Sequence, residues 1–184
     1  ASTYIQGELD AVYRGVYNDE YLELVEDMTK ADAEEKYKAN VSAEAEYLLY
    51  YFLGAGYPDE AVTAKAESLV KEIYSHAQYT VGEADKLQSG DFVVEVTLSP
   101  IEIMTLIPEE SYAEHWQAAC AEKGITTQEQ LNNVSEEEYA AIDAAYAMAL
   151  LEELDLDTAF MLYKLEDAGL SREDLTGGLC RRSA

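Results

Sequence analysis

The spacing of apolar residues changes after about residue 75 of this chain, and that change limits the folds it can adopt. Up to about residue 75 they recur every three or four positions, as in Ile5, Leu9 and Val12, which is typical of buried helical faces. Over residues 92–98 they alternate with polar residues instead, and residues 87–91 carry turn chemistry. The pattern predicts an α+β fold, mostly helical, with helices packed on a small antiparallel β-sheet formed by a hairpin at about 78–99.

A two-stranded hairpin is only marginally stable by itself, so we expect a third strand. Alternation at about 157–165 favours a strand there, although the same residues also fit a helix. The length of 184 residues suits one domain. We therefore predict a single α+β domain over residues 1–175 and a flexible tail over residues 176–184.

Several helix ends can be placed from capping and stop signals. Thr29 with Asp32 predicts a helix start, and two further pairs predict two more, Thr127 with Gln130 and Ser135 with Glu138. Glycines at 54, 56 and 124 predict helix ends. Pro58 is predicted to occupy the first position of the next helix, because proline loses no hydrogen bond there.

Composition narrows the classes of partner. The chain holds 38 Asp and Glu against 12 Lys and Arg, yet 48% of its residues are apolar and 15 are tyrosines. That apolar content predicts a folded chain rather than a disordered one. The net charge of −26 repels phosphates, which excludes nucleic acids and anionic membrane surfaces as expected partners. The longest apolar stretch, residues 47–57, is too short to cross a bilayer.

Metal and cofactor signatures are missing from the sequence. The two histidines, His76 and His115, lie far apart, and no Cys or His pair has the spacing of zinc ligands. Cys120 is interpreted as an inert buried thiol, with a bridge to Cys180 as the alternative. His115 and Cys120 are five residues apart, so a helix would turn them to different faces. We predict no metal, no cofactor and no catalytic residue.

A group of aromatic residues is the best candidate for a binding site. Tyr47, Tyr50 and Tyr51, with Phe52 and Trp116, could line a pocket whose polar tips bind a sugar or a peptide. The alternative is an aromatic core, which the helical spacing of the tyrosines favours. The predicted ligand-binding residues are Tyr47, Tyr50, Tyr51 and Trp116.

Four stretches of the sequence resemble small envelope lipoproteins of Gram-positive bacteria, often gut clostridia, whose function is unassigned. They are Tyr4…Leu9-Asp10…Tyr13-Arg14-Gly15…Tyr17…Tyr21, the aromatic segment Glu46–Phe52, Tyr79-Thr80-Val81-Gly82, and the stretch from Phe92 to Ile101. The resemblance covers about two thirds of the chain. It implies an extracellular domain anchored to the cell envelope by a lipid on a cysteine before Ala1, since removed. The family offers no catalytic residues to transfer.

Three functions therefore stand as hypotheses. The first is a non-enzymatic cell-surface or secreted domain that binds a protein, peptide or sugar. The second is a hydrolase that uses a carboxylate pair, which requires two acids in different environments, one of them buried. The third is an acidic cytosolic interaction protein.

Overall fold

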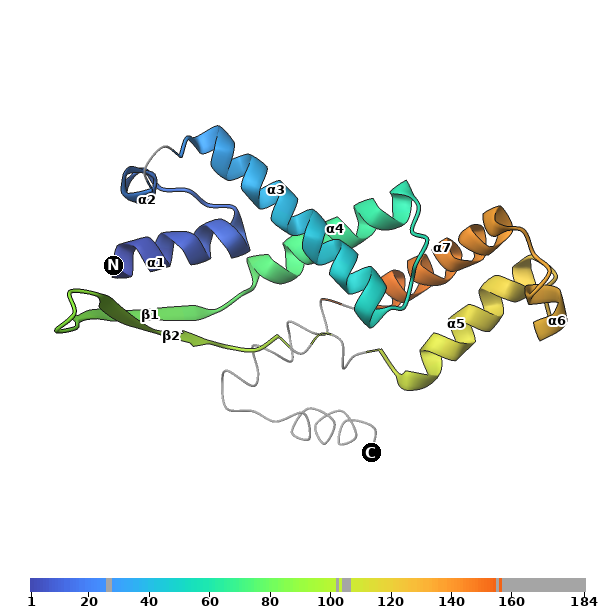
Figure 1. The fold of residues 1–184 in the computed structure, drawn as a ribbon. Helices are drawn as coiled ribbons and strands as arrows, with labels where there is room; N and C mark the ends of the chain where they lie inside the picture. The colour runs from blue at the N-terminus through green and yellow to red at the C-terminus, as the bar shows by residue number, and fades with distance from the viewer. Residues whose placement is uncertain (26–27, 102, 104–106, 155, 157–184) are drawn as a thin grey trace, which may run out of the picture.

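Helices make up most of the computed structural model, which describes residues 1–25, 28–101, 103, 107–154 and 156 (Figure 1). A two-stranded antiparallel sheet packs against them, which confirms the predicted α+β class. The elements in chain order are α1 (Ser2–Leu9), η1 (Asp10–Arg14), α2 (Asp19–Leu24), α3 (Lys30–Tyr47), η2 (Leu48–Phe52), α4 (Glu60–Ser75), β1 (Tyr79–Lys86), β2 (Phe92–Leu98), α5 (Glu109–Glu122), α6 (Gln128–Leu131) and α7 (Glu136–Glu153).

Helix starts follow the predicted capping pairs. Thr29, Thr127 and Ser135 each form a capping box with the residue three positions later, so α3, α6 and α7 begin where the sequence indicates. The prediction for Pro58 was wrong by two positions. The Asp59 carboxylate accepts a hydrogen bond from the Val62 N–H at 2.8 Å, which makes Asp59 the N-cap and starts α4 at Glu60.

Two segments, η1 and η2, are π-helical, and neither was predicted. In η2 the N–H of Leu53 donates to the carbonyl of Leu48 at 3.1 Å, a bond that spans five residues instead of four. In a regular helix residue 52 would repeat the buried position of Leu48. Because the π-helical turn contains one extra residue, Leu53 takes that buried position instead, and Phe52 is exposed.

The hairpin lies where the change from helical to alternating spacing of apolar residues predicts it. Its register pairs Tyr79 with Leu98 and Lys86 with Phe92, and a bulge interrupts the pairing between Val81 and Ala84. The strand β1 packs against α1, and the Ser2 hydroxyl donates to the Gly82 carbonyl at 2.8 Å. The third strand predicted at about 157–165 and the tail predicted at 176–184 lie outside the described residues.

One hydrophobic core joins the central helices. Figure 1 shows α3 crossing α4, and α5 beside α7 with the short α6 at the end where the two helices connect. The core side chains come mainly from α3, η2, α4, α5 and α7, with Leu53 directly after η2, and include Val41, Ala45, Leu49, Val62, Ala66, Leu69, Ala119, Ile142, Ala147, Leu150 and Leu151. The helices around this core carry the aromatic residues that the sequence singles out.

Candidate binding pocket at Trp116

The structure divides the predicted site residues between two places. Tyr47, Tyr50 and Tyr51 lie together at the end of α3 and in η2, whereas Trp116 lies on α5. A pocket forms at Trp116, and none of the three tyrosines lines it. The two places are therefore described separately.

The first place is the η2 patch, defined as Tyr47, Tyr50, Tyr51 and Phe52. Its rings contact one another, with centroids 4.7 Å apart for Tyr47 and Tyr51 and 5.0 Å apart for Tyr50 and Tyr51. Tyr50 is 64% exposed and Tyr51 is 68% exposed. The interpretation of these residues as an aromatic core was wrong, because Leu48 and Leu49 occupy the inward face of the segment.

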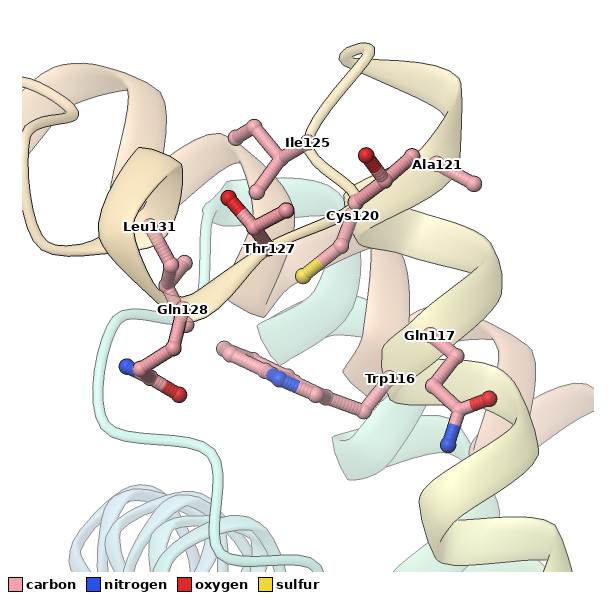
Figure 2. A pocket seen from close by; sticks show the side chains of 9 residues that line it. Trp116, Gln117, Cys120, Ala121, Ile125, Thr127, Gln128 and Leu131 are labelled. Carbon is pink, nitrogen blue, oxygen red and sulfur yellow. The ribbon is translucent and has the colours of Figure 1, made fainter.

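The second place is the Trp116 pocket, a hollow of about 480 Å³ between α5 and the loop that leads into α6 (Figure 2). In Figure 2 the indole ring projects from α5 towards Gln128, and the Cys120 sulfur lies above the ring. The lining residues carry amide, hydroxyl, thiol, aromatic or aliphatic side chains and none of them is charged: Trp116, Gln117, Cys120, Ala121, Ile125, Thr126, Thr127, Gln128 and Leu131.

Two tyrosine rings of α7 pack against Trp116. Its ring lies 5.5 Å from that of Tyr146 in an edge-to-face arrangement and 5.8 Å from that of Tyr139. Tyr146 is itself fixed, because its hydroxyl donates to the Leu53 carbonyl at 2.7 Å. Such packing restricts the orientation of the indole before any ligand arrives, which lowers the cost of binding.

A buried carboxylate also supports this region. Asp143 is 3% exposed and accepts a hydrogen bond from the backbone N–H of Tyr57 at 2.6 Å. The ring of Tyr57 in turn meets that of Tyr139 edge to face. Asp143 therefore ties the loop between η2 and α4 to α7, next to the rings that hold Trp116.

The opposite wall of the pocket depends on a turn and a cap. Gly124 has a φ of 74°, a left-handed conformation that favours glycine, and it ends α5 as predicted. The Gln130 side-chain oxygen then accepts hydrogen bonds from the N–H groups of Thr126 at 2.8 Å and Thr127 at 3.1 Å. These bonds fix the two threonines that line the pocket.

Cys120 contributes a neutral sulfur to the pocket. It is a free thiol, 7% exposed, as its interpretation as a buried residue predicted, and burial raises its pKa. A thiol held in its protonated form is a poor nucleophile. Cys180, the partner in the alternative of a bridge, lies outside the described residues.

A second polar cluster lies nearby on α5 and α7. The Ser111 hydroxyl donates to Glu153 Oε1 at 2.8 Å, and His115 Nε2 lies 2.7 Å from Glu153 Oε2. The hydrogen bond from Ser111 holds the pKa of Glu153 below its ordinary value, and the contact with His115 lowers this pKa to a smaller extent. In a catalytic triad the histidine stands between the nucleophile and the acid. Here the acid stands between the other two, so His115 has no bond through which to activate Ser111.

Sequence reasoning named Trp116 as a candidate but did not name the polar side chains around it. Gln117, Thr126, Thr127 and Gln128 were not predicted as site residues, although Thr127 was predicted as a helix cap. The capping pair with Gln130 was the available signal that this segment is ordered. The capping pair does not predict that α6 folds back towards α5.

Comparisons with known proteins leave the chain without an identified relative. No protein-family model, no curated protein and no solved structure matches it. In the part of the chain that the structure describes, no helix is long and apolar enough to cross a membrane. Within the same residues no group of three or more His, Cys, Asp or Glu side chains could hold a metal ion.

Proposed function

We propose that this protein is a non-enzymatic binding domain of the cell surface that takes a neutral sugar in the Trp116 pocket. The observation that carries the proposal is the lining of the pocket. Although the chain has a net charge of −26, the described residues that line this hollow are all uncharged. An uncharged ligand loses the least solvation free energy on entering such a pocket, because the lining offers no charged group to pair with a charge on the ligand.

The chemistry of the lining favours a sugar over a purely apolar ligand. The indole of Trp116 offers an apolar surface against which the C–H face of a sugar ring can pack, and the two glutamines and two threonines offer donors and acceptors for its hydroxyls. The volume of about 480 Å³ lies within the range of about 300–1,000 Å³ of small-molecule sites. The volume and the polarity of the pocket thus agree with a small saccharide.

The test uses the intrinsic fluorescence of the protein. Trp116 is the only tryptophan in the chain, so a change in tryptophan emission reports directly on this pocket. Titration with galactose, N-acetylglucosamine and maltose is expected to give a saturable change for at least one of them. No change up to about 100 mM, a hundred times a 1 mM dissociation constant, would contradict the proposal.

Matched variants separate the pocket from the rest of the surface. Gln128→Ala removes one amide from the lining and is expected to weaken sugar binding about tenfold, which corresponds to about 1.4 kcal/mol. Tyr51→Ser changes a comparably exposed residue of the η2 patch and is expected to leave sugar binding unchanged. Equal losses in both variants would mean that the pocket is not the binding site.

The η2 patch supports a second contact, with a protein or peptide partner. Four neighbouring aromatic rings on the surface are typical of an interaction site. The π-helical turn that exposes Phe52 points the same way, because such turns occur often at functional sites. Binding by Tyr47, Tyr50 and Tyr51 remains a prediction.

The proposed location at the cell envelope comes from the resemblance to envelope lipoproteins. Its test is fractionation of the source cells followed by detection of the protein with an antibody. Recovery with the envelope or in the medium is expected. Recovery in the cytosol would favour the alternative of an acidic cytosolic interaction protein.

A further inference from the structure

A small cavity of about 90 Å³ lies between the N-terminal helices and α3. The side chains that matter for its chemistry are Glu8, Tyr17, Tyr21, Lys36, Tyr37 and Asn40. Tyr17 and Tyr37 also line an open groove of about 410 Å³. These two residues therefore border both the cavity and the groove.

Two of the residues that line this cavity each carry a buried polar atom without a partner. The Tyr17 hydroxyl and the Asn40 side-chain nitrogen are covered, yet neither has a hydrogen-bond partner among the described residues. Buried polar groups in folded proteins nearly always have one. Burial also raises the pKa of Tyr17, so its hydroxyl keeps its proton. Both groups can donate, and both lack an acceptor oxygen.

The lining also offers a site for a positive charge. Glu8 Oε1 accepts a hydrogen bond from the Tyr21 hydroxyl at 2.8 Å, and Glu8 Oε2 lies 3.9 Å from the Lys36 ammonium. The Lys36 side chain is 60% exposed, so it can move aside at little cost. Three tyrosine rings line the space beside this carboxylate, and aromatic faces attract cations.

We propose that this cavity binds a small primary ammonium compound that carries an oxygen acceptor, the class to which ethanolamine and glycine belong. The ammonium group lies against Glu8 and the tyrosine rings. The oxygen accepts hydrogen bonds from Tyr17 and Asn40. A volume of about 90 Å³ equals that of about three waters in the liquid. Because covalently bonded atoms lie closer together than separate waters, this space suits a ligand of about four or five non-hydrogen atoms.

Ethanolamine and glycine present the same ammonium group but differ in the charge on the oxygen. Ethanolamine is a net cation, and Glu8 alone balances its charge. Glycine is a zwitterion, and its carboxylate matches the ammonium of Lys36 once Lys36 leaves Glu8. Binding of either compound supports the proposal. Tighter binding of glycine would indicate that Lys36 contacts the ligand carboxylate, and tighter binding of ethanolamine would indicate that it does not.

The experiment is isothermal titration calorimetry of the whole chain at neutral pH. Ethanolamine hydrochloride and glycine are the probes, and ammonium chloride at equal ionic strength is the salt control. Saturable heat from at least one probe, and none from ammonium chloride, is expected. No saturable heat from either probe would overturn the proposal, because ordered water alone would then fill the cavity.

Two variants locate the binding. Asn40→Leu removes one unpaired donor and keeps a similar volume, so its melting temperature is expected to equal or exceed that of the parent chain. Its affinity for the probe is expected to fall at least tenfold, as is that of Glu8→Gln, which keeps an acceptor for Tyr21.

Gln128→Ala, in the Trp116 pocket, serves as the matched control and is expected to bind the probe as the parent chain does. Unchanged affinity in both Asn40→Leu and Glu8→Gln would overturn the proposal. A loss in Gln128→Ala equal to theirs would do the same, because the probe would then occupy the other pocket.

Discussion

The η2 patch and the Trp116 pocket both arise from aromatic residues at helical spacing, but their surroundings differ. The rings of the η2 patch touch one another and face solvent, with no element of the described chain covering Tyr50 or Tyr51. Trp116 instead packs against the rings of Tyr139 and Tyr146, and the loop before α6 forms the opposite wall of its pocket. The difference shows that spacing sets which residues share a face, whereas a neighbouring element decides whether that face becomes a surface or a pocket.

The largest effect is expected at the carboxylate that supports the Trp116 side. Asp143→Ala removes the buried carboxylate that accepts the hydrogen bond of the Tyr57 N–H and is expected to lower the free energy of unfolding by about 2–3 kcal/mol. Urea unfolding followed by circular dichroism measures it. Asp143→Asn keeps an oxygen at the same place and is expected to cost less. Equal costs would contradict the role of the hydrogen bond.

A smaller effect is expected where a single hydroxyl is removed. Tyr146→Phe loses the hydrogen bond to the buried Leu53 carbonyl and is expected to lower the free energy of unfolding by about 1–2 kcal/mol. Tyr51→Phe makes the same chemical change on the exposed patch, and its expected cost is near zero. A similar cost at both positions would remove the energetic contrast between the two regions.

A pH-dependent effect is expected at Glu153. Its pKa is lowered in the folded chain, so its contribution to stability is present above the ordinary value of 4.5 and is lost as the pH falls through the folded pKa. Because the pair with His115 is partly exposed, we expect less than about 1 kcal/mol. Unfolding midpoints between pH 3 and 6 should depend less on pH in Glu153→Gln. An unchanged profile would count against this contribution.

The smallest effect on stability is expected at the η2 patch itself. The double variant Tyr50→Ser and Tyr51→Ser removes two exposed rings and is expected to change the free energy of unfolding by less than about 0.5 kcal/mol. Thermal unfolding measures it, and the result decides whether the patch is free to serve as a contact surface. A loss above about 2 kcal/mol would mean that these rings stabilise the fold.

Features that depend on a few neighbouring residues could be predicted well. The capping boxes at Thr29 and Ser135 need only four consecutive residues, and the hairpin turn needs only the chemistry of residues 87–91. Pro58 was misplaced because Asp59 competes with it as the start of α4. The π-helical turn of η2 escaped prediction, since its pattern of apolar residues also fits a regular helix.

The candidate site could be predicted only in part, because a pocket depends on distances between elements. Trp116 is recognisable in the sequence as a large amphipathic residue. Its separation from Tyr47, Tyr50 and Tyr51, and its approach to Gln128, follow from how α6 folds back on α5. The cavity at Tyr17 and Asn40 was likewise invisible, because it forms between helices that are neighbours only in space.

The sequence by itself determined the fold class, the hairpin, most helix boundaries and the acidic surface, because each follows from local periodicity, capping chemistry or composition. Only the tertiary structure decided which aromatic rings are exposed, which uncharged side chains surround Trp116 and which buried polar atoms lack partners. Those properties depend on contacts between residues far apart in the chain. The packing of α3, α4, α5 and α7 around one core sets these contacts, and local sequence patterns do not specify it.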